Sequence, residues 1–177
     1  QELGRINLDD TPYKKSSGKN AEIEFSKDGL SVSATMKFKG DADLNHNYSM
    51  AFTLYEYKPA VEVIWSISGK PAEAWPEGGW ISFPFNIENA QFKLGRLGGV
   101  IDPGKDIVKN SNLDYGFINT GVGVLDKNNQ GFGVTSADVP GVSLDRPGLW
   151  KYSTDFIPQK GNVFFNLYNN QWSTNFT

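Results

Sequence analysis

The sequence predicts an all-β protein, a large two-layer antiparallel β-sandwich (a supersandwich) with almost no helix. Apolar and polar residues alternate with period two in several short runs, and no segment shows apolar residues at a 3.6-residue period. The 177 residues include 12 Phe, 7 Tyr, 5 Trp and 19 Gly, a composition that favours strands joined by turns. Many strands without helices pack as a sandwich or a barrel.

The chain is expected to form one domain. Residues 1–20 are mostly polar and show no periodicity, so they predict an N-terminal arm. The remaining residues, 21–177, have the length of a single domain with a sizeable core.

The clearest local feature is a hairpin with its turn at Asp28-Gly29, a dipeptide that accepts the positive φ of a two-residue turn. Ile23 and Phe25 alternate with glutamates before this turn. The alternation continues from Leu30 to Lys39 after it. We therefore expect one wet and one buried face, with Ile23 and Phe25 facing the core.

Further strands are expected at short spacing, over residues 48–57, 60–68, 80–87, 115–125, 132–135 and 163–167. Pro84 lies inside one of these runs and predicts a sheet edge or a bulge there. The apolar side of the runs carries residues that should be buried between the sheets: Trp65, Phe83, Phe85, Phe165 and Leu167.

Charge and composition argue against several classes of partner and cofactor. The net charge of −3 does not suit nucleic-acid binding, and no apolar run is long enough to span a bilayer. Without cysteine and with one histidine, the chain can build neither a disulfide nor a Cys/His zinc site. We expect no cofactor. The compartment is undetermined, with a secreted or periplasmic location slightly favoured.

The sequence supports no catalytic residue or metal ligand. His46 lies in a polar loop and is interpreted as solvated, and no Gly-x-Ser-x-Gly motif presents a serine. Asp41, Asp43 and Asn45 have the spacing of the opening of a calcium loop. However, His46 and Phe52 stand where that loop needs Gly and Glu. We interpret the segment as a charged surface turn.

Two segments are unusually rich in aromatic, amide and glycine residues. Residues 70–85 place Trp75 and Trp80 around Glu77, beside Gly78-Gly79. Residues 166–176 combine four asparagines with tyrosine, phenylalanine and Trp172. Amides that bond hydroxyl groups and rings that cover apolar sugar faces suit carbohydrate. A rigid, aromatic-capped corner of a sandwich is the simpler interpretation.

These segments resemble the C-terminal β-sandwich of family 38 glycoside hydrolases, the α-mannosidases. The resemblance covers about residues 60–177 and rests on residues 70–85, on residues 92–106 and on the closing residues 169–176. It implies a galactose mutarotase-like supersandwich. It also implies that the catalytic aspartates and metal ligands lie on other domains of such an enzyme, so no catalytic residue is carried over to this chain.

The first hypothesis is therefore a non-catalytic β-sandwich domain of an α-mannosidase-like glycoside hydrolase, whose partner is carbohydrate or a neighbouring catalytic domain. The alternatives are a free-standing carbohydrate-binding module and a small glycosidase or lyase that uses carboxylates such as Glu77 and Asp102. Arg96 could pair with either carboxylate. The candidate carbohydrate-binding residues, expected near one end of the sandwich, are Trp75, Glu77, Trp80, Arg96, Asp102 and Trp172.

Overall fold

The computed structural model describes residues 14–41, 44–74, 77–111, 113, 115–147 and 157–170. Within these residues it contains twelve strands and one four-residue helix, and every strand pairing is antiparallel. The predicted all-β class is confirmed. The structure divides after Glu73 into two compact units, and each is described by itself.

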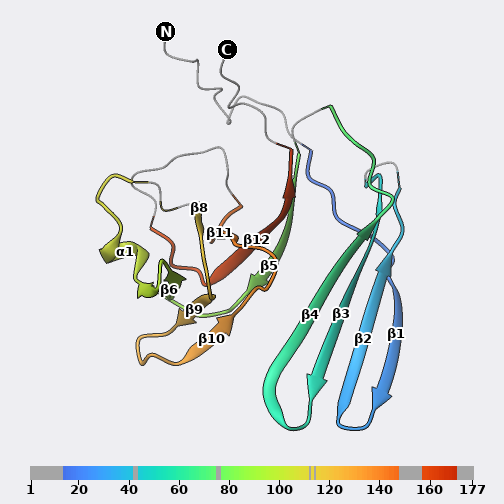
Figure 1. Cartoon of the computed structure of the whole chain (residues 1–177), viewed down its shortest axis with the longest axis horizontal. Helices are drawn as coiled ribbons and strands as arrows, with labels where there is room; N and C mark the ends of the chain where they lie inside the picture. Colours follow the sequence, from blue (N-terminus) through green and yellow to red (C-terminus); the bar gives the residue numbers. More distant parts are fainter. Residues whose placement is uncertain are drawn as a thin grey trace. The chain divides into compact units, whose positions relative to one another are not determined.

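The first unit is a four-stranded sheet in which neighbours in sequence are neighbours in space (Figure 1). Its strands are β1 (Glu22–Asp28), β2 (Ser31–Phe38), β3 (Asn47–Tyr55) and β4 (Lys58–Ser68). Gly29 has a φ of 50°, so the predicted β1–β2 hairpin is confirmed. Its two-residue turn is Gly29-Leu30, one residue later than expected, because Asp28 pairs with Ser31. Of the predicted arm, residues 1–13 lie outside the described residues. Gly18 donates its N–H to the Tyr48 hydroxyl (3.1 Å).

The two faces of this sheet differ in chemistry. The strand register places three rows of residues on one face, here called the apolar face: Ile23-Met36-Met50-Trp65, Phe25-Ala34-Phe52-Val63 and Lys27-Val32-Leu54-Val61. The opposite face carries the Lys37–Glu24 and Lys39–Glu22 ion pairs at 2.6 and 2.9 Å. A hydrogen bond joins Ser33 and Thr53 on the same polar face.

The expected burial of Ile23 and Phe25 is wrong, because their side chains are 53% and 77% exposed. Period two in a sequence identifies which residues share a face of a strand. Burial of that face also requires a second layer, which a single meander of four strands does not supply. Trp65, on the same face, is partly buried.

The second unit contains two four-stranded sheets. One has the order β10-β9-β6-β7, formed by Gly131–Val134, Val122–Leu125, Gln91–Arg96 and Gly99–Ile101. The other has the order β5-β12-β11-β8, formed by Gly78–Pro84, Asn162–Asn169, Gly141–Leu144 and Tyr115–Phe117. Helix α1 (Pro103–Asp106) follows β7. Strand β5 lies at a sheet edge and ends at Pro84, as the proline predicts.

The core of this unit is formed by buried side chains from both sheets, so the two sheets pack face to face as a sandwich. Phe92, Leu94, Val122 and Val124 come from the first sheet; Val142, Leu144, Val163 and Phe165 come from the second. The predicted burial of Phe165 is confirmed at 2% exposure. Phe83 and Phe85 are partly buried and pack against this cluster.

Leu167 is only partly buried, which corrects its expected place in the core. The pairing of β12 with β5 shifts between Asn166 and Tyr168, a bulge at Leu167. An extra residue in one strand interrupts the alternation of faces, so the period-two pattern no longer places Leu167 on the core side.

The single strand expected over residues 115–125 is two strands in different sheets. β8 ends at Phe117 and β9 begins at Val122. The connecting turn lies against Gly95: the Asn119 N–H donates to the Gly95 carbonyl (2.7 Å), and a Cβ on Gly95 would overlap the Thr120 side chain. Strands β6 (six residues), β7 (three residues) and β11 (four residues) were not predicted.

Candidate functional site

The two aromatic and amide segments meet where β5 pairs with β12. In this register Trp80 faces Asn166, Gly79 faces Tyr168 and Gly78 faces Asn169. Residues about 90 positions apart in the sequence, from the two aromatic and amide segments, therefore become neighbours on paired strands (Figure 1).

A set of amide hydrogen bonds fastens this pairing at the bulge. The Asn166 side-chain N–H group donates to the carbonyls of Gly79 (3.2 Å) and Tyr168 (3.1 Å), and the Asn166 side-chain oxygen accepts from Asn169 (2.8 Å). The Asn170 N–H donates to the Glu77 carbonyl (2.8 Å). Asn166 is buried, and its amide satisfies backbone carbonyls that the bulge removes from the regular ladder.

Gly79 is needed at this position because the Tyr168 ring lies against it. A Cβ on Gly79 would overlap that ring. The sequence argument that Gly78-Gly79 permits a close approach of another segment agrees with this contact. Burial, and after it the nearby Glu77 carboxylate, raises the pKa of Tyr168 above its ordinary value.

Trp80 belongs to a row of three aromatic rings, here called the Trp80 cluster: Trp80, Tyr115 and Phe117. The Trp80 and Tyr115 centroids are 6.4 Å apart with ring planes at 87°, and Tyr115 and Phe117 are 5.2 Å apart at 78°. Both are edge-to-face contacts. The Phe117 side chain is 55% exposed. Burial raises the pKa of Tyr115. The cluster therefore has two partly buried rings, Trp80 and Tyr115, and one exposed ring, Phe117.

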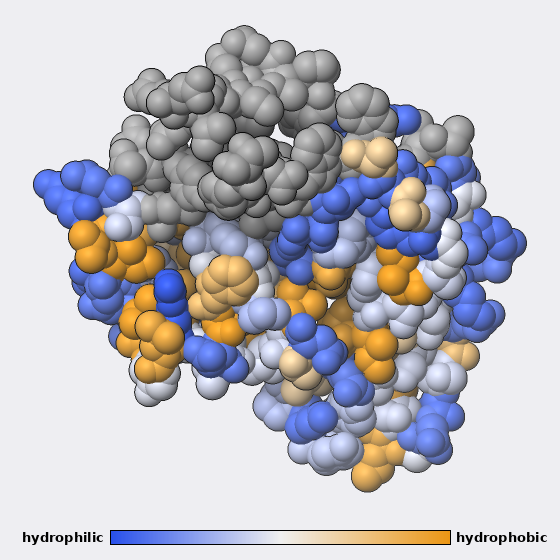
Figure 2. Space-filling view, turned by 45° about the horizontal axis from the view of Figure 1, so that its top comes forward, coloured by the Kyte–Doolittle hydropathy of each residue, from blue (hydrophilic) through white to orange (hydrophobic). Residues whose placement is uncertain are grey.

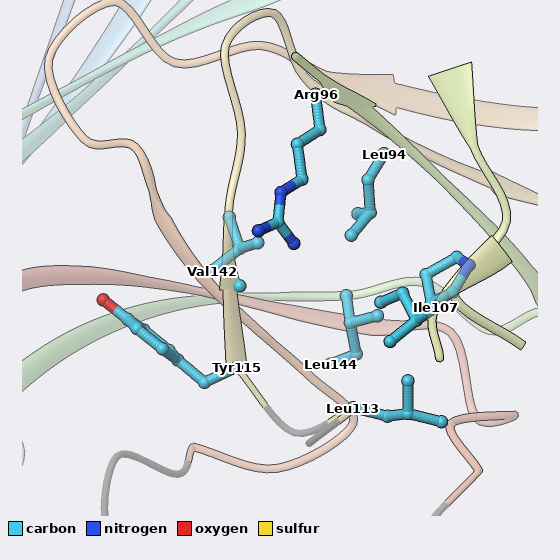
Figure 3. Close-up of a pocket in the computed structure, with 9 residues that line it drawn as sticks. Leu94, Arg96, Ile107, Leu113, Tyr115, Val142 and Leu144 are labelled. Atoms are coloured by element: carbon cyan, nitrogen blue, oxygen red, sulfur yellow. The ribbon is translucent and has the colours of Figure 1, made fainter. Parts of the chain in front are cut away.

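Arg96 lines a small pocket with room for about one water molecule. The other walls are apolar side chains from both sheets and from around α1, among them Leu94, Ile107, Leu113 and Leu144. Figure 3 shows the guanidinium directed toward Val142, and the Tyr115 hydroxyl directed away from the pocket. Tyr115 lines this pocket and also contacts Trp80, so it connects the Arg96 pocket with the Trp80 cluster.

Asp102 caps helix α1. Its carboxylate accepts from the Gly104 N–H (3.0 Å) and pairs with Lys93 and Lys105, each at 3.1 Å. Partial burial acts to raise the pKa of Asp102, but the hydrogen bonds from Lys105 and Lys93 outweigh it and hold the pKa below its ordinary value. The ion pairs among the described residues join Asp102 to these lysines and not to Arg96.

The structure thus brings together only part of the predicted set. Glu77 and Trp80 lie at the start of β5, beside Asn169 and Asn170. Arg96 lines the adjoining pocket, whereas Asp102 belongs to the cap of α1. Trp75 and Trp172 lie outside the described residues. The sequence reasoning missed Tyr115 and Phe117, although aromatic residues at i and i+2 in a strand indicate two rings on one face.

His46 is buried, so its interpretation as a solvated loop histidine is wrong. Its ring lies 6.5 Å from the Tyr48 ring, and its Nδ1 is 3.0 Å from the Asn45 side-chain oxygen. The backbone at Gly40 approaches so closely that a Cβ there would meet the His46 backbone at 2.9 Å. A polar loop in the sequence can fold back on itself and bury one of its members.

Of the residues with calcium-like spacing, the structure describes Asp41 and Asn45. Asp41 accepts the Leu44 N–H through its side chain (2.8 Å), and Asn45 bonds Glu73; Asp43 lies outside the described residues. The described part of the chain contains no group of three or more acidic or histidine side chains placed to hold a metal ion. It also contains no helix long and apolar enough to cross a membrane.

The fold and this site define the chain as an all-β protein with an aromatic and amide cluster at a sheet edge. Comparison with protein families, with curated proteins and with solved structures found no match.

Proposed function

We propose that this chain is a non-catalytic β-sandwich domain of an α-mannosidase-like glycoside hydrolase, and that it contacts carbohydrate at the Trp80 cluster. One observation carries the proposal. The stretch around Glu77–Trp80 that resembles the mannosidase domain is hydrogen-bonded to the end of β12, where Asn169 and Asn170 begin the closing stretch of the resemblance.

The chemistry of the cluster suits a sugar. Tryptophan and tyrosine rings cover the apolar faces of sugar rings, and Phe117 offers a further exposed ring. Asn169 is an exposed residue at the end of β12; it pairs with Gly78, two residues before Trp80 on β5, and its side-chain N–H group already donates to Asn166. Amides donate and accept hydrogen bonds, as sugar hydroxyls require.

Titration of the wild type and of three variants with soluble α-mannosides tests the proposed contact. We expect weak binding, in the micromolar to millimolar range, that falls at least about tenfold in Trp80→Ala and Phe117→Ala. Phe132→Ala is the matched control, because Phe132 is equally exposed (57%) but belongs to the other sheet. Binding that is absent in the wild type, or that all three variants retain, contradicts the contact.

The alternative of a small carboxylate-dependent glycosidase finds less support in Asp102. A general acid of a glycosidase has a raised pKa, whereas the lysine pairs lower the pKa of Asp102. An aryl α-mannoside assay on this chain separates the two. Turnover above the uncatalysed rate that is lost in Glu77→Gln or Asp102→Asn favours the enzyme. Binding without turnover favours the accessory domain or a free-standing carbohydrate-binding module.

A further inference from the structure

The first unit presents a large apolar surface that its own four strands leave open. On the apolar face, four large side chains are more than half exposed: Ile23 and Phe25 on β1, Leu54 on β3 and Val61 on β4. Val32, on β2, is 47% exposed. Figure 2 shows apolar residues, in orange, reaching the molecular surface among hydrophilic ones. Large apolar residues that share one face of a sheet and stay more than half exposed indicate an interaction surface.

The face is suited to another sheet. Antiparallel sheets with one apolar face bury it against the apolar face of a second sheet, at a separation of about 10 Å. The opposite face of the same sheet carries ion pairs and hydroxyl groups and is suited to water. Association therefore involves one face of the sheet.

The size and charge of the face fit a second copy of this chain. Four strands about 4.8 Å apart and about eight residues long at 3.3 Å per residue give a footprint of roughly 500 Å², so two copies bury roughly 1,000 Å², the lower bound of specific interfaces. Lys27 is the one charged residue in the three rows of this face and lies on edge strand β1. Two facing copies therefore place no like charges at the centre of the interface.

We propose that two copies of this chain associate through the apolar face of β1–β4 to form an eight-stranded sandwich. The proposal is independent of the carbohydrate contact. It predicts a dimer of the full chain at about 100 µM that dissociates on dilution.

Sedimentation velocity over a range of protein concentrations tests for the dimer. The variants replace exposed side chains, so we expect each of them to fold. Phe25→Glu and Val61→Glu place a carboxylate in the interface and should each weaken dimerisation at least about tenfold. Ser26→Glu is the control, because Ser26 is the exposed neighbour of Phe25 on the polar face, and it should leave the dimer unchanged.

A wild-type chain that is monomeric throughout the range overturns the proposal, and another occupant then covers this face. A dimer that Phe25→Glu and Val61→Glu leave intact overturns it as well. Hydrogen exchange separates face packing from edge pairing. Packing through the face leaves the outer N–H groups of β1 and β4 exchanging equally in monomer and dimer, whereas edge pairing slows them and contradicts the proposal.

Discussion

Single glycines decide how closely the strands of the second unit approach one another. A Cβ on Gly131 would overlap the Val124 carbonyl oxygen, a backbone atom that cannot rotate away. Two residues further along the same strand, a Cβ on Gly133 would meet nothing within 4 Å. The same substitution should therefore have different consequences for stability at these two positions.

Gly131→Ala is expected to lower the free energy of unfolding by about 1–3 kcal/mol, because the strand must move to admit the methyl group. Gly133→Ala should change it by less than about 1 kcal/mol, or stabilise the fold by restricting the unfolded chain. Chemical denaturation of both variants provides the measurement. Equal losses at the two positions would show that strand propensity, and not the contact with Val124, determines the effect.

Asp102 also acts at the scale of a residue, through its charge. Its pKa is lower in the folded state than in the unfolded chain, so its contribution to stability is present above the unfolded pKa of about 3.9 and is lost as pH falls below it. In Asp102→Asn the free energy of unfolding should depend less on pH in this acid range.

Equilibrium unfolding at a series of acid pH values checks this dependence. Glu88→Gln, at an exposed position of the same unit, controls for the loss of one negative charge. A profile of Asp102→Asn that runs parallel to the wild type between about pH 2 and pH 5 would contradict the structural role of the lysine pairs.

At the scale of an element, turns determine which predictions from the sequence succeed. The β1–β2 hairpin was predictable because the alternation on both sides agrees with a glycine that accepts positive φ, although its turn is Gly29-Leu30 and not Asp28-Gly29. The division of residues 115–125 was not, because Asn119–Gly121 turns by hydrogen bonds to Gly95, a residue more than 20 positions earlier. Leu167 likewise was misplaced by a bulge, which no local pattern announces.

Gly29→Val is expected to destabilise the first unit by about 1–3 kcal/mol, because a β-branched residue is strained at positive φ. Nothing lies within 4 Å of a Cβ at Gly29, so the effect arises from the backbone and not from a clash. Gly29→Asn, which tolerates this conformation, should cost much less. Thermal unfolding of the two variants distinguishes them, and equal melting temperatures would argue against strain at the turn.

At the scale of the whole molecule, strands with the same alternation of apolar and polar residues differ in how deeply their apolar side chains are buried. Phe165 and Phe25 both lie on the apolar side of a strand, yet one is 2% and the other 77% exposed. The sequence predicted the fold class and which residues share a face. It could not predict which faces find a second layer, because that depends on contacts between distant segments. For the same reason the sequence could not predict that Tyr115 contacts Trp80, because the two residues lie on different strands far apart in the sequence.

Phe165→Ala should cost about 3–5 kcal/mol of unfolding free energy, because it leaves a cavity between packed sheets. Phe25→Ala should cost less than about 1 kcal/mol when the chain is studied at a concentration low enough to be monomeric. Denaturant titrations of both variants make the comparison. A large loss for Phe25→Ala under these conditions would mean that the apolar face is already covered within one chain.

The pairing of β5 with β12 also determines the order in which the chain can fold. In the first unit every strand pairs with its neighbour in sequence, so the sheet can assemble as its residues leave the ribosome. In the second unit β5, the first strand, pairs with β12, the last, as the pairing of Gly78 with Asn169 shows. Closing such a long loop slows folding. During synthesis β5 therefore exists without its partner for most of the length of its unit, and a chain cut before Asn162 loses the strand that joins β5 to β11.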